Sequence, residues 1–323
     1  MNEPDPPHWE RSVLEKVALK AIEEQRRARQ WSALFKLLWF TVIFLVLASA
    51  FGWIGRPDKD SAATIGKHTA VVDVEGIIGI DSKASAEKLM KGLNRAFKDA
   101  NTQGVLLRIN SPGGSPVQAG YVNDEIRRLR AKYPGIPVHA VVQDLCASGG
   151  YYIAVAADRI YVDKASLVGS IGVIMGGFGF TGAMDKLGVE RRAYTSGENK
   201  DFLDPFLPEN PRHREHAQQM IGEIHQQFVR TVRQGRGTRL KETPEMFSGL
   251  FWTGEKSIEL GLADGLGSAE YVAREVIKAE KLVDFTPDEN YFERFTKMFG
   301  ASVGETFGRA AIEAASRSVT QVR

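Results

Sequence analysis

Short apolar runs alternate with amphipathic patterns along much of the chain, and this alternation limits the fold more than any other feature. The runs at 69–76, 104–110 and 137–143 have the length and composition of buried strands. Helical patterns occupy the intervals at 84–99 and 115–133. Strand–helix–strand order predicts parallel pairing through right-handed crossovers. We therefore expect an α/β fold with a parallel sheet built from βαβ units.

Further patterns extend this prediction towards the C-terminus. A short helix is expected to begin near Gly149, directly after the third strand. Two more strands are predicted at 159–163 and 190–195. Three later helices are predicted at 211–234, 254–261 and 268–280.

The composition is that of a folded protein without unusual charge. Of the 323 residues, 43% are hydrophobic and 25% are charged, which is ordinary for a globular chain. The net charge of +2 gives no reason to expect a nucleic-acid partner. Cys146 is the one cysteine, so an intrachain disulfide is excluded. We expect no cofactor and no metal.

One segment departs from the pattern of a water-soluble domain. Residues 37–55 contain no charged side chain, and as a helix they would cross about 30 Å of hydrocarbon. Trp31 and Trp53 lie near its two ends, where indole rings favour the membrane interface. The alternative is a cleaved signal peptide, and the sequence Ala-Ser-Ala at 48–50 resembles a cleavage site. Because the segment follows a long charged stretch, we expect an uncleaved transmembrane anchor.

Basic residues predict the orientation of this anchor. Arg26, Arg27 and Arg29 precede the uncharged segment, whereas Arg56 behind it is diluted by nearby acidic residues. This bias predicts a single-pass protein of the cytoplasmic (inner) membrane, with its N-terminus in the cytoplasm and its main domain on the other side. The predicted organisation is a cytosolic segment that is partly helical, a transmembrane helix, a linker, a main α/β domain and a helical extension, at 1–36, 37–55, 56–66, 67–280 and 281–323.

Two glycine-rich loops follow the second and third predicted strands. They are "NSPGGSP" at 110–116 and "DLCASGG" at 144–150. Chemistry in a parallel sheet collects beyond the carboxyl ends of the strands, so these loops should face one another across a cleft. Ser148 is then a candidate nucleophile, because the adjacent glycines admit a substrate backbone and free main-chain N–H groups for an oxyanion. The alternative is an ordinary turn in which Ser148 caps a helix.

A serine nucleophile needs a base, and the sequence offers two kinds. None of the six histidines falls in a loop predicted to border the cleft, although a histidine base stays an alternative. Lys200 lies in the segment 194–206, which is predicted to follow a strand and carries apolar neighbours. Burial favours the neutral amine that a lysine base requires. Ser170, in the small-residue loop 166–173, is a candidate partner for this lysine or an ordinary turn residue.

Five motifs in order resemble one known family. They are "LRINSPGGSP", "ASGGYYIAVAAD", "GSIGVI", "SGENKD" and "ELGLADGLGS", and together they span residues 67–280. This part of the chain is similar to the signal peptide peptidase A family in its short form, which is peptidase family S49. The resemblance implies a ClpP/crotonase-like fold. It also implies a membrane-bound serine endopeptidase that cleaves remnant signal peptides and assembles into a homo-oligomeric ring or bowl.

The same resemblance assigns roles to individual residues. Ser148 matches the family nucleophile and Lys200 the general base. Gly113 and Gly114 match the loop that supplies an oxyanion N–H, and Gly149 supplies the N–H beside the nucleophile. Ser170 matches a position that would hydrogen-bond the lysine. Whether Ser148 and Lys200 meet within one chain or between two chains is left open.

Several interpretations remain open at this stage. A crotonase-type acyl-CoA enzyme would share the oxyanion architecture, and a membrane scaffold could keep the fold without catalysis. The segment 172–180 could line a pocket, but we favour core packing beneath the sheet. Cys146 is expected to be a small buried residue and not a second nucleophile. Residues 281–323 could contact a membrane, another subunit or the core.

Overall fold

The structure is a computed structural model that describes residues 8–50 and 66–287. The chain divides into two compact units, Met1–Ala63 with Tyr291–Arg323 and Thr64–Asn290. Part of the predicted transmembrane segment (51–55), most of the predicted linker and most of the predicted C-terminal extension lie outside the described residues.

The described part of the first unit is one long helix, α1 (His8–Ala50). It runs without a break through position 36, where the sequence predicts a change from cytosolic segment to anchor. Apolar side chains on its second half are exposed, among them Leu37 and Phe40. Within the described residues, no helix has both the length and the apolar character needed to cross a membrane. The transmembrane anchor therefore stays a prediction.

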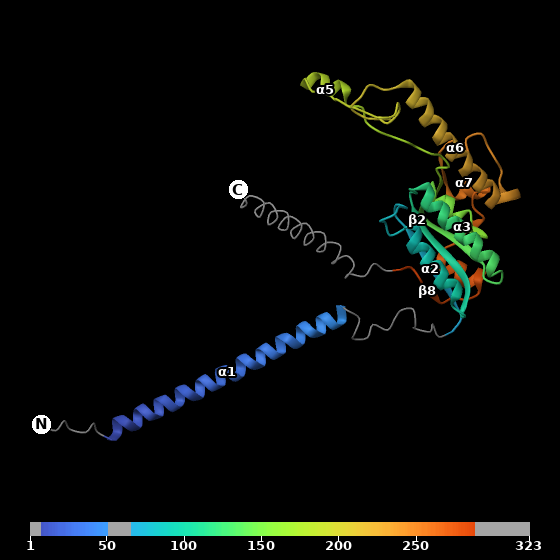
Figure 1. Ribbon diagram of the computed structural model, residues 1–323. Helices are drawn as coiled ribbons and strands as arrows, with labels where there is room; N and C mark the ends of the chain where they lie inside the picture. The colour runs from blue at the N-terminus through green and yellow to red at the C-terminus, as the bar shows by residue number, and fades with distance from the viewer. Residues whose placement is uncertain (1–7, 51–65, 288–323) are drawn as a thin grey trace. The chain divides into compact units, whose positions relative to one another are not determined.

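The second unit is built on one sheet that is parallel with a single exception. The strand order is β6-β5-β3-β2-β1-β8, with β4 paired to β3 and β7 paired to β4, and among the described strands only the β5–β6 pair is antiparallel. Figure 1 shows β2 and β8 of this sheet beside α2 and α3. The expected parallel sheet of βαβ units is confirmed. The strands are β1 (His68–Glu75), β2 (Thr102–Ser111), β3 (Val138–Ala147), β4 (Arg159–Val162), β5 (Leu167–Gly169), β6 (Phe251–Thr253), β7 (Gly265–Leu266) and β8 (Leu282–Asp284).

Helices cover the two faces of the sheet unequally. The face against α2, α3 and α4 carries the main core, in which Val105, Leu107 and Ile109 of β2 are fully buried. The residue between the first two of these, Leu106, points to a smaller cluster on the opposite face. The helical elements of this unit are α2 (Ala86–Lys98), α3 (Pro116–Lys132), α4 (Gly149–Ala154), α5 (Thr181–Leu187), α6 (Pro211–Arg236), η1 (Gly237–Arg239), α7 (Gly254–Glu259), α8 (Ala269–Tyr271) and η2 (Val272–Ile277).

Strand β3 changes partner along its length. Its first half pairs with β4, where His139 lies opposite Arg159. Its second half pairs with β5, where Ala147 lies opposite Gly169. The sheet therefore forks at β3, and the fork brings the end of β5 beside the residue that follows β3, which is Ser148.

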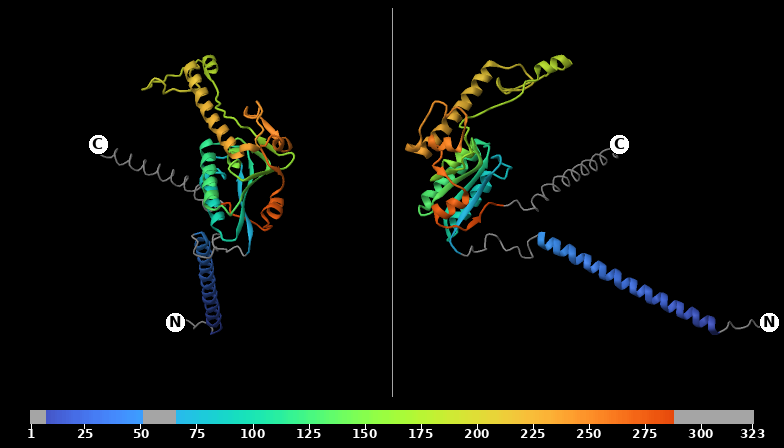
Figure 2. Two further views of the ribbon diagram at one scale, coloured as in Figure 1. Left: turned by 90° about the vertical axis from the view of Figure 1, so that its right-hand side faces the viewer. Right: turned by 180° about the vertical axis from the view of Figure 1, so that it is seen from behind.

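The predicted strand at 190–195 is wrong. These residues form no strand and are all exposed. They belong to an excursion, defined here as residues 173–210, which contains α5 and extends away from the sheet at the N-terminal end of α6 (Figures 1 and 2). The sequence pattern failed here because a strand needs a neighbouring strand to accept its backbone hydrogen bonds, and among the described residues no strand pairs with 190–195.

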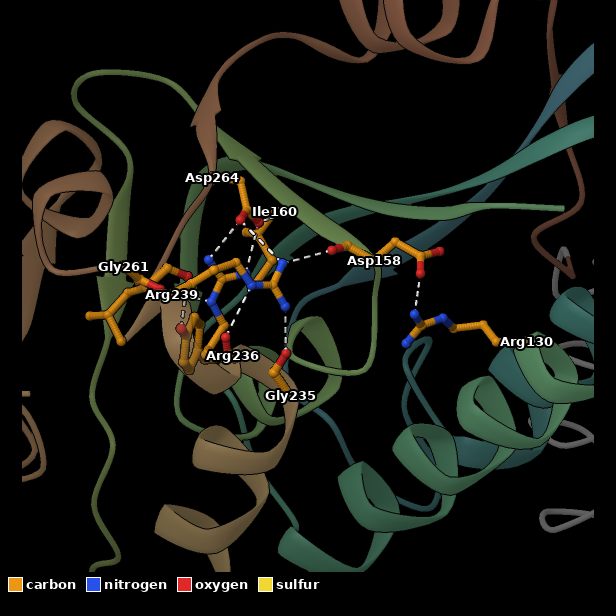
Figure 3. A network of polar contacts seen from close by, with 10 residues as sticks. Arg130, Asp158, Ile160, Gly235, Arg236, Arg239, Gly261 and Asp264 are labelled. Carbon is orange, nitrogen blue, oxygen red and sulfur yellow. Dashed lines mark hydrogen bonds and ion pairs between the residues drawn. The ribbon is translucent and has the colours of Figure 1, made fainter. Parts of the chain in front are cut away.

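A buried ion pair fixes the C-terminal end of α6 to the sheet (Figure 3). Arg236 is 2% exposed, and its guanidinium donates to both carboxylate oxygens of Asp264 at 2.7 and 2.9 Å. Its Nε donates to the Gly261 carbonyl at 2.8 Å. Burial alone would raise the pKa of Asp264, but the hydrogen bond and the charge of Arg236 outweigh it and leave that pKa lowered. Arg239 adds a second contact to the same carboxylate at 3.2 Å.

Candidate active site

Ser148 opens into a cavity of about 510 Å³ at the carboxyl end of the sheet. The cavity combines main chain from the glycine loops with apolar side chains, a composition that suits a peptide substrate. Its lining residues are Gly114, Pro116, Ser148, Gly149, Tyr152, Ser170, Gly172, Val173, Ile174, Ile224, Gln227, Phe228, Ser248 and Gly249. Four of the six residues singled out in the sequence are among them, namely Ser148, Gly114, Gly149 and Ser170.

Ser148 has a strained backbone at the junction between β3 and α4. Its φ of 50° and ψ of −120° lie in a region that non-glycine residues rarely occupy. The conformation is held by two hydrogen bonds, from Ser148 N to the Gly169 carbonyl and from Tyr152 N to the Ser148 carbonyl, both 2.9 Å. Its side chain makes no capping bond to α4, so the interpretation of Ser148 as a simple helix cap is not supported. Such strain, held by surrounding structure, is typical of functional residues.

Gly113 and Gly114 lie directly against the start of α4. A Cβ atom at Gly113 would come within 2.7 Å of Ser148 Cβ and of Gly149 N, so only glycine fits there. The Gly113 N–H is already used, because it donates to Ser111 Oγ at 3.1 Å. The Gly114 N–H has no acceptor among the described residues, and a Cβ atom on Gly149 would lie 3.3 Å from it. The free amides next to Ser148 are therefore those of Gly114 and Gly149.

Ser111 and the chain at Ile78 hold this glycine loop in place. Ser111 Oγ donates to the Gly76 carbonyl at 2.6 Å while it accepts from Gly113. Ile78 N donates to the Gly113 carbonyl at 2.8 Å, and Ser115 N donates to the Ile78 carbonyl at 2.9 Å. The loop is thus fixed on both sides before any ligand arrives, which is the condition for a preorganised oxyanion site.

Ser170 reaches the cavity through the fork in the sheet. It directly follows β5, has a φ of 49°, and is held by a 2.8 Å hydrogen bond from its N–H to the Leu250 carbonyl. The structure therefore brings Ser170 and Ser148 to one cavity. The contact between Ser170 and Lys200 that the family resemblance implies is not found among the described residues.

Lys200 does not lie at this cavity. It is exposed, in the excursion between α5 and α6, and it is not among the residues that line the cavity. The sequence placed it at the carboxyl end of a strand, and that placement is wrong because no strand precedes it. Within one chain, the structure therefore assembles the candidate nucleophile and oxyanion amides without the candidate base.

The cavity offers no other base. Among its lining residues, as far as the structure describes the chain, no histidine, lysine or carboxylate occurs. His225 lies nearby on α6, and its Nε2 is 3.2 Å from the Ile171 carbonyl, which occupies that nitrogen. His139 is buried in β3, and burial lowers its pKa.

One wall of the cavity was missed in the sequence. It comes from α6, which supplies Ile224, Gln227 and Phe228. Phe228 packs on Tyr152 with ring centroids 5.1 Å apart. The sequence holds a signal for this wall, because Ile224 and Phe228 are four residues apart and therefore lie on one face of a helix.

The segment 172–180 is not core, so the preference for core packing is wrong. Gly172, Val173 and Ile174 line the cavity, and the residues from Ile174 onwards are exposed. Cys146 is fully buried behind Ser148, as expected, and burial raises the pKa of its thiol. A buried thiol of this kind is not a competing nucleophile.

Comparison with known proteins identifies the family. The model of peptidase family S49 matches residues 130–283. The chain is 31% identical over 232 residues to the putative protease MJ0651 of Methanocaldococcus jannaschii, and the match covers 70% of this chain and 74% of that protein. The chain belongs to peptidase family S49, the signal peptide peptidase A family. The family resemblance noted in the sequence is thereby confirmed.

Other relatives are matched over smaller parts of their length. The putative signal peptide peptidase SppA of Enterococcus faecium is 31% identical over 62% of this chain and 58% of its own. The Na⁺/H⁺ antiporter NhaA of Brucella melitensis is 47% identical over 54% of this chain, but only 24% of that protein is matched. The chain thus spans between about a quarter and three fifths of these two relatives. A solved structure of a mutant of the 1510-N membrane-bound stomatin-specific protease has a TM-score of 0.40 at 12% identity, covering 69% of this chain and 99% of that one.

Proposed function

We propose that this S49 family member is a serine endopeptidase with Ser148 as its nucleophile and a ClpP/crotonase-like fold. The observation that carries the proposal is the strained Ser148 between two free main-chain amides, those of Gly114 and Gly149, at the mouth of an apolar cavity. Strain at a serine and unused amides beside it serve no purpose in a simple turn. Together they match the requirements of acyl transfer, which needs a nucleophile and an oxyanion site within reach of one carbonyl group.

The proposed reaction proceeds through an acyl-enzyme. Ser148 Oγ attacks the scissile carbonyl carbon while a neutral amine accepts the hydroxyl proton. The Gly114 and Gly149 amides donate to the oxyanion of the tetrahedral intermediate. The ammonium then gives its proton to the leaving nitrogen, and the C–N bond breaks to release the first product. Water, deprotonated by the same amine, hydrolyses the ester and restores the Ser148 hydroxyl.

We assign the base to Lys200 of a neighbouring subunit. Two observations support this assignment. The cavity around Ser148 lacks an ionisable base among its lining residues, and Lys200 stands exposed on an excursion that extends away from its own sheet (Figures 1 and 2). In a homo-oligomeric ring or bowl, each excursion could contact the next subunit and bring Lys200 of one chain to Ser148 of its neighbour. The same contact would cover the amine from water and favour its neutral form.

The proposed substrates are short apolar peptides, including remnant signal peptides. Val173, Ile174 and Phe228 line the cavity, and an apolar wall with small residues favours small apolar side chains before the scissile bond. We further propose that α1 anchors the protein in the cytoplasmic membrane by a single pass, with the peptidase domain outside the cytoplasm. The exposed apolar side chains on its second half support the anchor.

A subunit-mixing experiment tests the proposal. Ser148→Ala and Lys200→Ala, made in the full chain, should each abolish cleavage of a peptide with a small apolar residue before the scissile bond. Lys200→Arg should be equally inactive, because a guanidinium does not deprotonate. Co-assembly of the Ser148→Ala and Lys200→Ala chains should restore about a quarter of the wild-type rate, since random neighbours in a ring join an intact serine to an intact lysine at that frequency. Full activity of Ser148→Ala would refute the peptidase assignment, whereas two inactive variants that never complement would refute the shared site alone.

A further inference from the structure

The turn that carries Lys200 is tightly folded. Lys200 N donates to the Gly197 carbonyl at 3.1 Å, and Phe202 N donates to the Asn199 carbonyl at 3.2 Å. Leu203, next along the chain, has a φ of 57°. Consecutive turns of this kind fix the backbone on both sides of Lys200, although its side chain is exposed.

One histidine of α6 contacts this turn on both sides of the lysine. The Nε2 atom of His213 lies 3.2 Å from Asn199 Oδ1, so an Nε2–H donates to the amide oxygen. The His213 ring also packs on Phe202, with centroids 5.2 Å apart. His213 is only 6% exposed, although most of its neighbours on the first turns of α6 are exposed. The imidazole is thus enclosed by the residues that bracket Lys200.

The second histidine on this part of α6 provides a comparison. His216 packs edge-on against Phe202, with ring centroids 5.6 Å apart, but it is exposed and makes no hydrogen bond to Asn199 among the described contacts. His213 and His216 therefore share the aromatic partner and differ in the hydrogen bond. Removing each in turn separates the contribution of the hydrogen bond from that of the ring contact.

The helix that carries His213 also forms part of a cavity wall. Ile224 and Phe228 of the same α6 line the cavity at Ser148, and Arg236 anchors the end of the helix to the sheet. A turn fixed to the start of α6 is therefore fixed to a rigid element that is itself fixed to the core (Figure 1). Without His213, the contacts that the described residues keep between the turn and this helix include the edge-on Phe202–His216 pair and the exposed Glu198–Arg212 ion pair at 3.2 Å, which are weaker than a buried hydrogen bond.

We infer that His213 is a positioning residue for Lys200, because its contacts with Asn199 and Phe202 hold the turn that carries the amine in a fixed position on α6. These two contacts are called the clamp below. The inference rests on the proposed function, in which Lys200 is the base. A misplacement of about 1 Å at a reacting group is enough to cost on the order of a hundredfold in rate. The clamp explains how a base on an exposed excursion can be placed precisely enough to accept a proton from the Ser148 hydroxyl.

Kinetics of the full chain give the first test. His213→Ala should lower kcat at least about tenfold with KM unchanged, because the amine is misplaced while the peptide cavity is intact. His213→Gln should retain most of the activity, since its amide N–H can donate to Asn199 in place of the imidazole. His216→Ala should lose no more than about threefold in kcat, because the hydrogen bond remains.

If His213→Ala does not fold, Asn199→Ala removes the same bond from the exposed side and should give the same loss. An unchanged kcat, or a Gln variant as poor as the Ala variant in a folded protein, would overturn the inference.

Mixed assemblies give the second test, because a merely structural residue would matter in every subunit. His213→Ala is added either to the Ser148→Ala chain, which supplies Lys200, or to the Lys200→Ala chain, which supplies Ser148. The clamp predicts loss of complementation in the first mixture and full complementation in the second. Equal loss in both mixtures, or loss in neither, would overturn it. If the two parent chains do not complement at all, the shared site fails, and the clamp is then decided by the kcat values alone.

Discussion

The two halves of the proposed site are built in opposite ways. Ser148 and its glycine loops lie at the end of a buried parallel sheet, where hydrogen bonds to Gly169, Tyr152 and Ile78 hold the backbone and leave the Gly114 and Gly149 amides free. Lys200 lies on an excursion whose residues 185–200 are all exposed. The difference teaches that a sheet end can hold one side chain of the proposed site in a fixed backbone conformation, while a segment outside the sheet leaves the other exposed.

The excursion exposes more apolar surface than a monomer needs. Ile174 and Tyr194 are 92% and 93% exposed, and Phe178 is exposed beside the stacked pair Phe180 and Phe206, whose centroids are 5.3 Å apart. Phe178, Phe180 and Phe206 form one exposed aromatic cluster, and an exposed apolar cluster of this kind marks an interaction site. The strands at the centre of the sheet bury their apolar side chains, although Ile77, Ile80 and Val117 near the glycine loops are also exposed.

The first prediction removes the Arg236–Asp264 ion pair, which ties the end of α6 to the sheet. Arg236→Met leaves the partly buried Asp264 with only the longer contact to Arg239, and should destabilise the folded unit by up to about 3–5 kcal/mol in urea denaturation at neutral pH. The lowered pKa of Asp264 means that its contribution is present above its unfolded pKa of about 3.9 and is lost as the pH falls through the folded pKa. The difference between variant and wild type should therefore shrink below about pH 4.

The control for this variant is an exposed ion pair. Arg274→Met removes a contact of 2.8 Å to Glu275 on the surface and should cost about 0–1 kcal/mol. Equal losses for Arg236→Met and Arg274→Met would mean that burial of the first pair has no energetic consequence.

The second prediction concerns only the part of the proposed site that lies at the end of the sheet, around Ser148. A Cβ atom at Gly114, where φ is 146°, would collide with the Ile78 carbonyl oxygen and shift the amide proposed for the oxyanion. Gly114→Ala should lower kcat by about a hundredfold to a thousandfold, the usual cost of losing one oxyanion donor. Gly120→Ala on α3, where the added Cβ meets nothing within 4 Å, is the matched control and should keep full activity. Wild-type kcat in a folded Gly114→Ala protein would exclude this amide from the site.

The third prediction compares the two regions by proteolysis. Trypsin should cut after Arg191 and Arg192 of the excursion about tenfold faster than after Arg108 or Arg127 in the folded core, because local opening costs least where few buried contacts exist. Assembly should protect the excursion sites and leave the core sites unchanged. The cleavage products can be followed by mass spectrometry at several protein concentrations. Cleavage of the excursion at a rate independent of assembly would argue against a contact between the excursion and a neighbouring subunit.

The smallest effect is expected at Cys146. Its burial raises the pKa of the thiol, so iodoacetamide should not label the native protein at pH 8 but should label it in urea. Cys146→Ala removes one buried atom, should cost about 1 kcal/mol and should leave peptidase activity intact. Rapid labelling of the native thiol, with loss of activity, would mean that the wall behind Ser148 opens in solution.

Prediction from the sequence succeeded where the pattern is local. The strands around Val105 and Val141 and the helix that follows Ser115 can be predicted from composition and spacing alone. Because sites in parallel sheets lie beyond the carboxyl ends of the strands, the sequence also predicted that the loops of Ser148 and Gly114 face one cleft, and both residues line one cavity. The strand predicted at 190–195 failed because pairing depends on a partner that no local pattern reports.

What the sequence determined by itself is the family, the parallel sheet and the loop that carries Ser148, because these follow from motifs and periodicities within short windows. The tertiary structure decided the rest of the site. The fork at β3 brought Ser170 to Ser148, α6 supplied the wall at Phe228, and the excursion kept Lys200 away from its own cavity. These three outcomes depend on contacts between residues far apart in the chain, and only the packed structure selects such contacts.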